Sequence, residues 1–269
     1  MPEHQTWFRF LPNYEELRAI LEGRLGATWY ARQTLDLQHV FGTILVVLIL
    51  FLLGLLVWLK VRDAKKALIP EDKLTPRTFA ELLTEIVLGQ MEAQMSAKDA
   101  RHFLPLIGSC AFFIFLSNAL GVIPGLAPPT SNLNTTLALA AVIVVAAEIY
   151  GFRRHGFGYL KEFFGGLTEW YYLLTPLPYL LFLIEIISHI ARLLSLSVRL
   201  LGNMYADHTV VGVFVTLVPF VPVLVPLPVQ VLGVLVIVVQ TAVFCLLSTV
   251  YISLAVGGEE AEEHGSHSH

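Results

Sequence analysis

The chain has 269 residues, of which 56% are hydrophobic and 14% are charged, with a formal net charge of -4 and a mean hydropathy of +0.70. Soluble domains carry roughly 25% charged residues, so this composition excludes water as the main solvent. The two cysteines, Cys110 and Cys245, lie inside apolar runs, which favours buried thiols over a disulfide.

The apolar runs predict an all-α polytopic membrane protein. A helix of roughly 20 apolar residues crosses the hydrocarbon core of a bilayer. The runs 39–59, 103–123 and 135–152 meet that requirement approximately, and we expect about three upright spans. Residues 39–256 as a whole are predicted to form a single membrane domain.

The segment 77–96 has apolar residues at 79, 82, 83, 86, 87 and 91, which places one apolar stripe on a helix. It is too polar to span a membrane. An amphipathic helix on the cytoplasmic membrane surface and a soluble packing helix in a loop are both compatible with this pattern.

Turn-forming residues separate the spans. The segment 124–134 is rich in them, and Asn134 or Thr135 is predicted to cap the following helix. Gly151 to Gly158 is predicted to mark the next break.

The distribution of Lys and Arg predicts the orientation. The segment 60–102 holds eight of them and the segment 153–175 holds three, whereas 124–134 holds none. Basic loops stay in the cytoplasm. We therefore expect 1–38 to be an external N-terminal segment, and the acidic, His-containing residues 257–269 to form a cytoplasmic tail.

The last third of the membrane domain predicts a hairpin of two long helices, 176–218 and 229–256, joined by a proline-rich turn. No proline lies between Pro178 and Pro219. A continuous helix of that length is about 60 Å long. This is twice the hydrocarbon thickness, so we expect the helix to be strongly tilted.

A polar stripe follows one face of the first hairpin helix at spacings of 3 or 4, and it comprises Glu185, Ser188, Arg192, Ser195, Arg199 and Asn203. Ionisable groups inside a bilayer usually mark an ion path. A static hydrogen-bond network with a neighbouring helix is the alternative.

Other polar residues extend this pattern. Asp207 and His208 follow the stripe, with His208 on the opposite face of the helix from Arg199. On the last helix, Gly233, Gln240 and Tyr251 lie nearly on one face.

The run Ser195-Leu-Ser-Val-Arg199-Leu-Leu-Gly-Asn203-Met-Tyr-Ala206 closely resembles the signature of the a subunit of F-type ATP synthases. The run from Gln240 to Tyr251 resembles the last helix of that family. The segments Leu116–Pro124 and Pro129–Thr136 resemble its second span and the outer loop. The resemblance covers about 80–256.

The resemblance implies roles for individual residues. Arg199 matches the essential arginine that faces a carboxylate of the rotating ring, and Asn203 and Gln240 match the polar residues around it. Glu185 and Ser188 match the cytoplasmic half-channel. The other residues assigned to the proton path or its surroundings are Ser195, Arg192, Glu148 and Tyr251.

The outer half-channel departs from the common bacterial pattern. His208 occupies a position that is often Glu in bacteria and His in mitochondria, and Asp207 stands where a small residue is common. Gly233 stands where many members have His or Glu. We expect Asp207 and His208 together to replace the missing group.

The implied function is that of a proton-conducting stator subunit in the bacterial inner membrane, with a c-ring and b-type peripheral stalk subunits as partners. Protons are the expected ion and sodium is the alternative, with no cofactor, metal or nucleic acid. The chain has no Walker-type phosphate loop, so we do not expect it to hydrolyse ATP alone. An independent secondary transporter and a structural subunit of a respiratory complex are the other classes of protein compatible with the residues.

Overall fold

The computed structural model describes residues 38–61, 75–123, 126, 128–156, 177–217 and 226–256. These ranges contain six α-helices, one 3₁₀ turn and no strand. The elements are α2 (Gln38–Val61), α4 (Pro76–Glu92), α5 (Ala97–Gly121), η2 (Pro129–Ser131), α6 (Leu133–His155), α8 (Leu177–Leu217) and α9 (Pro226–Val256). Every helix except α4 is long and apolar enough to cross a membrane. The predicted all-α polytopic fold is confirmed, while the division into domains stays a prediction.

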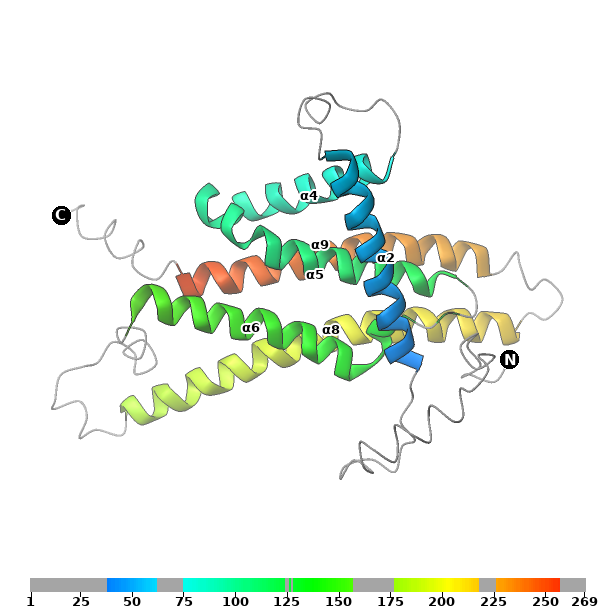
Figure 1. Ribbon diagram of the computed structural model, residues 1–269. Helices are drawn as coiled ribbons and strands as arrows, with labels where there is room; N and C mark the ends of the chain where they lie inside the picture. Colours follow the sequence, from blue (N-terminus) through cyan, green and yellow to red (C-terminus); the bar gives the residue numbers. More distant parts are fainter. Residues whose placement is uncertain are drawn as a thin grey trace, which may run out of the picture.

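Four helices, α5, α6, α8 and α9, run roughly side by side, and α4 lies along them against α5 and α9 (Figure 1). The start of α5, the end of α6, the start of α8 and the end of α9 lie at one end of this bundle. We call this the inner end, because the basic loops predicted to be cytoplasmic adjoin it. The opposite end, with η2, is the outer end.

Helix α2 crosses this bundle steeply and contacts α4, α5 and η2 (Figure 1). The three predicted upright spans therefore exist as helices but do not share one direction. If α2 follows the membrane normal, the helices of the bundle are tilted away from it. The 41 residues of α8 form one unbroken helix, as predicted.

The core of the bundle is built where four helices meet. One buried cluster joins Ile114 of α5, Ile143 of α6, Leu196 and Leu200 of α8, and Phe244 of α9. These side chains are at most 1% exposed. Burial of one large aliphatic or aromatic side chain contributes about 1.5–3 kcal/mol when the alternative is water. In lipid the gain comes from close packing, so this cluster fixes how the helices fit together.

Helix ends differ from the sequence prediction at several places. Asn132, not Asn134 or Thr135, caps α6, and its side-chain oxygen accepts a hydrogen bond from the Asn134 backbone N–H at 2.9 Å. The break predicted between Gly151 and Gly158 is present, because α6 continues through Gly151 and ends at Gly156, whose φ of 57° suits glycine. A glycine alone did not break the helix, because its backbone hydrogen bonds continue through it.

Helix α5 begins six residues before the predicted start at 103. Ser96 is its N-cap and accepts a hydrogen bond from the Asp99 N–H at 3.2 Å. The Ser-x-x-Asp spacing carries this capping signal. Helix α9 similarly begins at Pro226, three residues earlier than predicted, because proline is tolerated in the first turn of a helix.

The amphipathic helix predicted at 77–96 is α4, capped by Thr75 and starting at Pro76. Val87 and Met91 are buried against α5 and α9. Leu82 and Ile86, from the same predicted stripe, are more than half exposed. The helix therefore packs on the bundle and also presents apolar side chains outward, which combines the two alternatives.

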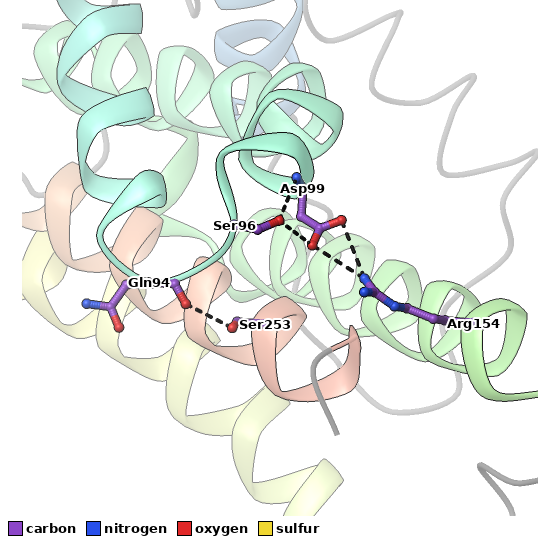
Figure 2. A network of polar contacts seen from close by, with 5 residues as sticks. All are labelled: Gln94, Ser96, Asp99, Arg154 and Ser253. Carbon is purple, nitrogen blue, oxygen red and sulfur yellow. Dashed lines mark hydrogen bonds and ion pairs between the residues drawn. The ribbon is translucent and has the colours of Figure 1, made fainter. Parts of the chain in front are cut away.

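Polar contacts tie the inner ends of the helices together (Figure 2). Arg154 at the end of α6 donates to both carboxylate oxygens of Asp99 at 3.4 Å, and the Ser96 hydroxyl donates to Asp99 at 2.7 Å. The Ser253 hydroxyl of α9 donates to the Gln94 backbone carbonyl at 3.0 Å. The α4–α5 turn is thus joined to both α6 and α9.

A second set of contacts closes the outer end. The buried Thr130 hydroxyl of η2 donates to Asn118 Oδ1 of α5 at 2.6 Å. The Asn132 amide lies 3.4 Å from His39 Nδ1, near the start of α2. The start of α2 and the loop at η2 therefore lie on the same side of the molecule. The predictions for residues 1–37 and 257–269 lie outside the described residues.

We expect Asn118→Ala to lower the free energy of unfolding by about 1–3 kcal/mol, because it leaves the buried Thr130 hydroxyl without its acceptor. Unfolding of the purified chain in mixed micelles with increasing SDS, followed by circular dichroism, measures this change. Asn134→Ala is the matched control, since Asn134 is exposed. Equal midpoints for Asn118→Ala and the parent chain would contradict the role of this bond.

Candidate functional site

The predicted polar stripe on α8 divides into two parts in the structure. Glu185, Ser188 and Arg192 are half-buried, whereas Ser195, Arg199 and Asn203 are exposed. The division follows from packing, because the inner half of the stripe lies against α6 and α9 and the outer half lies beside an uncovered surface. One stripe in the sequence therefore gives a pocket and an exposed polar row.

The pocket lies toward the inner end, where α6, α8 and α9 converge, and has a volume of about 150 Å³. Its polar lining consists of Glu148, Glu185, His189, Arg192 and Tyr251. Glu148 and Tyr251, which the sequence placed only around the proton path, therefore line the same pocket as Glu185. Small and aliphatic side chains such as Ala147 and Leu254 form the rest of the wall.

His189 is the residue at the centre of this pocket that the sequence prediction missed. Its Nε2 lies 2.6 Å from Glu148 Oε1, and its Nδ1 lies 3.4 Å from Glu185 Oε1 and 2.8 Å from the Glu185 backbone oxygen. Its spacing of four residues from Glu185 was the available signal, because such pairs are neighbours on a helix. Glu148 could not be paired with it from the sequence, because the contact depends on how α6 packs on α8.

Arg192 closes the pocket on the side nearer to Arg199. Its guanidinium carbon lies 5.8 Å from the centre of the Tyr251 ring, which is a cation–π geometry. This contact joins α8 to α9 near the inner end. It also places a permanent positive charge between the carboxylates and the exposed polar row.

Arg199 lies on a different kind of surface. It is exposed, and within the described ranges no hydrogen bond or ion pair involves its side chain. The exposed large hydrophobic residues of this part of α8 and of α9 are Leu194, Val198, Val231, Leu232, Val234, Leu235, Val238 and Val239. Among the described side chains of α8 and α9, Arg199 is the one charged group that is exposed.

Two polar contacts hold the helix segment on either side of Arg199. The Ser197 hydroxyl lies 3.1 Å from the Thr136 hydroxyl of α6, and both residues are fully buried. One turn beyond Arg199, the Asn203 amide donates to Gln240 Oε1 of α9. The resemblance implied only that Asn203 and Gln240 lie around Arg199, so their contact with each other was not predicted, and neither was the Thr136–Ser197 contact.

The face of α9 that was predicted from Gly233, Gln240 and Tyr251 is the one turned toward the bundle. Gly233 and Gln240 are buried, and Tyr251 is half-buried over Arg192. The side chains of Asp207 and His208 lie outside the described part of the chain. Their expected cooperation in an outer half-channel stays a prediction.

This arrangement can carry out acid–base chemistry at one place and electrostatic attraction at another. The pocket supplies carboxylates and an imidazole that can accept and release protons. Arg199 cannot act as an acid or base, because a guanidinium stays charged in proteins. It can attract an anionic group that moves along the exposed apolar surface.

Comparison with known proteins agrees with the family resemblance found in the sequence. Residues 40–253 match the model of the family described as ATP synthase A chain. The ATP synthase subunit a of Sorangium cellulosum (strain So ce56) is 39% identical, over 98% of this chain and 100% of the relative. ATP synthase subunit a 2 of Syntrophotalea carbinolica is 42% identical, over 83% of this chain and 87% of the relative.

ATP synthase subunit a of Geobacter sulfurreducens is 40% identical, over 65% of this chain and 72% of the relative. The family match covers the described helices from near the start of α2 almost to the end of α9. It includes the pocket, Arg199 and the Asn203–Gln240 contact. The chain therefore belongs to the family of the ATP synthase a subunit.

Proposed function

We propose that this chain is the stator a subunit of a bacterial F-type ATP synthase and provides two proton half-channels against a rotating c-ring. The observation that carries the proposal is Arg199, an exposed guanidinium and the one exposed charged group among the described side chains of α8 and α9. A lipid-facing Arg of this kind is costly, so a partner with a negative charge must approach it.

The partner's carboxylate determines what Arg199 does. A charged carboxylate is strongly disfavoured in lipid, so a ring site crosses the lipid face in its neutral form. Close to Arg199 the ionised form is favoured by the opposite charge, and the ring site releases its proton. The guanidinium itself takes no proton. It separates the place where a ring site is unloaded from the place where the next is loaded.

The inner half-channel is assigned to the pocket at the inner end. Glu185 and Ser188 lie on the part of α8 that adjoins it, and the carboxylate of Glu185 lines it. Ser195 lies between the pocket and Arg199 on the exposed row. A proton released beside Arg199 reaches the pocket along this side of α8 and leaves to the cytoplasm.

The outer half-channel is assigned to the other side of Arg199, with Asn203, Asp207, His208 and Gln240. Gly233 is buried and has no side chain to take part. The Asn203–Gln240 contact lies at the end of this region nearest to Arg199 along α8. Buried aliphatic side chains of the four-helix cluster fill the interior between the two regions and favour a barrier to a continuous water path.

The remaining assignments concern the ion, the orientation and the assembly. Protons are the proposed ion, with a driving free energy of about 2.3 kcal/mol per charge per 100 mV. Exposed basic residues at the inner end, Lys98, Arg101, Arg153 and Arg154, support a cytoplasmic location for that end. The partners are the c-ring and the b-type peripheral stalk within the ATP synthase of the cell inner membrane.

Arg199→Ala is expected to reduce proton-driven ATP synthesis to background while the complex still assembles, because Arg199 makes no contact that holds the described helices together. Arg199→Lys should fail too, since an ammonium can lose its proton when buried and lacks the planar guanidinium. ATP synthesis in vesicles at matched complex content is the measurement.

The control for this experiment is Ser253→Ala, which removes a contact at the inner end far from Arg199 and should leave synthesis nearly unchanged. A purely structural role for Arg199 predicts the reverse pattern, with lost assembly in the Ala variant and near-normal synthesis in the Lys variant. Substantial synthesis by an assembled Arg199→Ala complex would remove Arg199 from the mechanism.

Asn134→Cys should react with a membrane-impermeant thiol reagent from outside the cell, because Asn134 is exposed beside η2 at the outer end. Thr130→Cys on the same loop is the matched control and should be protected, since Thr130 is fully buried. Cys110 and Cys245 are buried and are replaced by Ala in the background. Labelling of Asn134→Cys only from the cytoplasmic side would reverse the proposed orientation.

A further inference from the structure

We propose that Glu148 and His189 form a store for a single proton in the inner half-channel, so that both belong to the proton path itself. This inference rests on the proposed function, since it concerns how protons leave that pocket. It assigns a role to a residue of α6, a helix that supplies no other ionisable side chain to the pocket. The starting point is the position of the His189 ring between two carboxylates.

The contact of Nδ1 fixes one of the two ring hydrogens. This nitrogen lies 2.8 Å from the backbone oxygen of Glu185. A carbonyl oxygen can only accept a hydrogen bond, so Nδ1 carries a hydrogen and donates it. The tautomer of His189 is therefore set by the helix backbone, and Nε2 remains as the nitrogen that gains or loses a proton.

The contact of Nε2 then requires a second proton. This nitrogen lies 2.6 Å from Glu148 Oε1. The distance is that of an ion pair, which forms when Nε2 is protonated, although the two atoms are not aligned as a hydrogen bond. An unprotonated nitrogen and an ionised carboxylate would repel each other at this distance, so we assign one proton to the pair, either as imidazolium with carboxylate or as imidazole with carboxylic acid. Both forms hold the same single exchangeable proton.

Other polar groups also face the pair. Glu185 and Arg192 face it from α8, and Tyr251 faces it from α9. The Arg192 guanidinium and the two carboxylates are therefore held in one pocket with the imidazole, so a proton carried by the pair stays close to groups of both charges.

The pocket also allows the proton to leave. A water molecule occupies about 30 Å³ in the liquid, so a volume of about 150 Å³ has room for a few waters. The Glu148 side chain is 32% exposed and the His189 side chain is 17% exposed, so the carboxylate is the member of the pair that is more open to water. In loading, an O–H bond of a hydronium breaks, a bond to the pair forms and water is left. Release is the reverse step, in which the pair gives its proton to a water. A pocket water then bridges the lone pairs of His189 Nε2 and Glu148 Oε1.

The experiment measures passive proton flux through vesicles that contain the complex with its catalytic head stripped off. Glu148→Gln and His189→Gln should each slow the flux at alkaline pH by about tenfold. This is less than the ~10²-fold typical of a lost acid–base group, because pocket water provides a slower route. The loss should shrink at mildly acidic pH, where hydronium is abundant.

Two further results separate a store from a merely structural contact. The double variant should be no slower than either single variant, because the two residues hold one proton together. Added imidazole should restore flux in His189→Ala. His102→Gln and Glu85→Gln, on exposed residues of α5 and α4, are the controls and should retain the parent flux and pH profile.

The proton store would be refuted if the losses of proton flux multiply in the double variant. It would also be refuted if the losses are equal at every pH and added imidazole does not restore the flux. If His189→Ala does not assemble, the nearly isosteric Glu148→Gln still decides the question by its pH profile. The Arg199→Ala variant distinguishes failure of the proton store from failure of the proposed function. An inactive Arg199→Ala complex beside a fully active Glu148→Gln complex removes only the store, whereas an active Arg199→Ala complex removes the proposed function.

Discussion

The position of Arg199 depends on how the opposite face of α8 is anchored. Leu196, Leu200 and Met204 are buried in the bundle, at 2% exposure or less. The Thr136–Ser197 contact and the Asn203–Gln240 contact hold α8 to α6 and α9 on either side of the arginine. A charge that must meet a moving partner cannot be held by a salt bridge, because the pairing would compete with the partner. The backbone beneath it is fixed instead, and the guanidinium stays available.

The described side chains differ on the two sides of Arg199. On the inner side, carboxylates, an imidazole and a guanidinium gather in one pocket between three helices. On the outer side, the described residues supply amides at Asn203 and Gln240 and a glycine at 233. Titratable groups store and transfer protons, whereas neutral amides orient hydrogen bonds without storing charge. Among the described residues, the inner side of Arg199 therefore offers groups that titrate, and the outer side offers groups that orient hydrogen bonds.

Much of the fold could be predicted because hydrophobic runs and proline spacing act locally. The unbroken α8 followed from the absence of proline between Pro178 and Pro219. Helix ends were less predictable, since Asn132 rather than Asn134 or Thr135 caps α6, and α5 begins at its Ser96 cap, six residues before the predicted start. The polar stripe was found by its spacing, but its division into a pocket and an exposed row depends on which helices cover α8. The Glu148–His189 contact depends on the same packing and could not be derived from one helix alone.

The contacts of Figure 2 have a mechanical consequence. In the proposed assembly, a ring that turns against α8 and α9 exerts a sideways force on them, and the stator transmits that force. Directional bonds such as Arg154 to Asp99 and Ser253 to Gln94 lengthen as soon as α6 or α9 slides past the α4–α5 turn. In the proposed assembly the inner end is thereby stiffened against sliding, and force on α8 and α9 is shared with α4, α5 and α6.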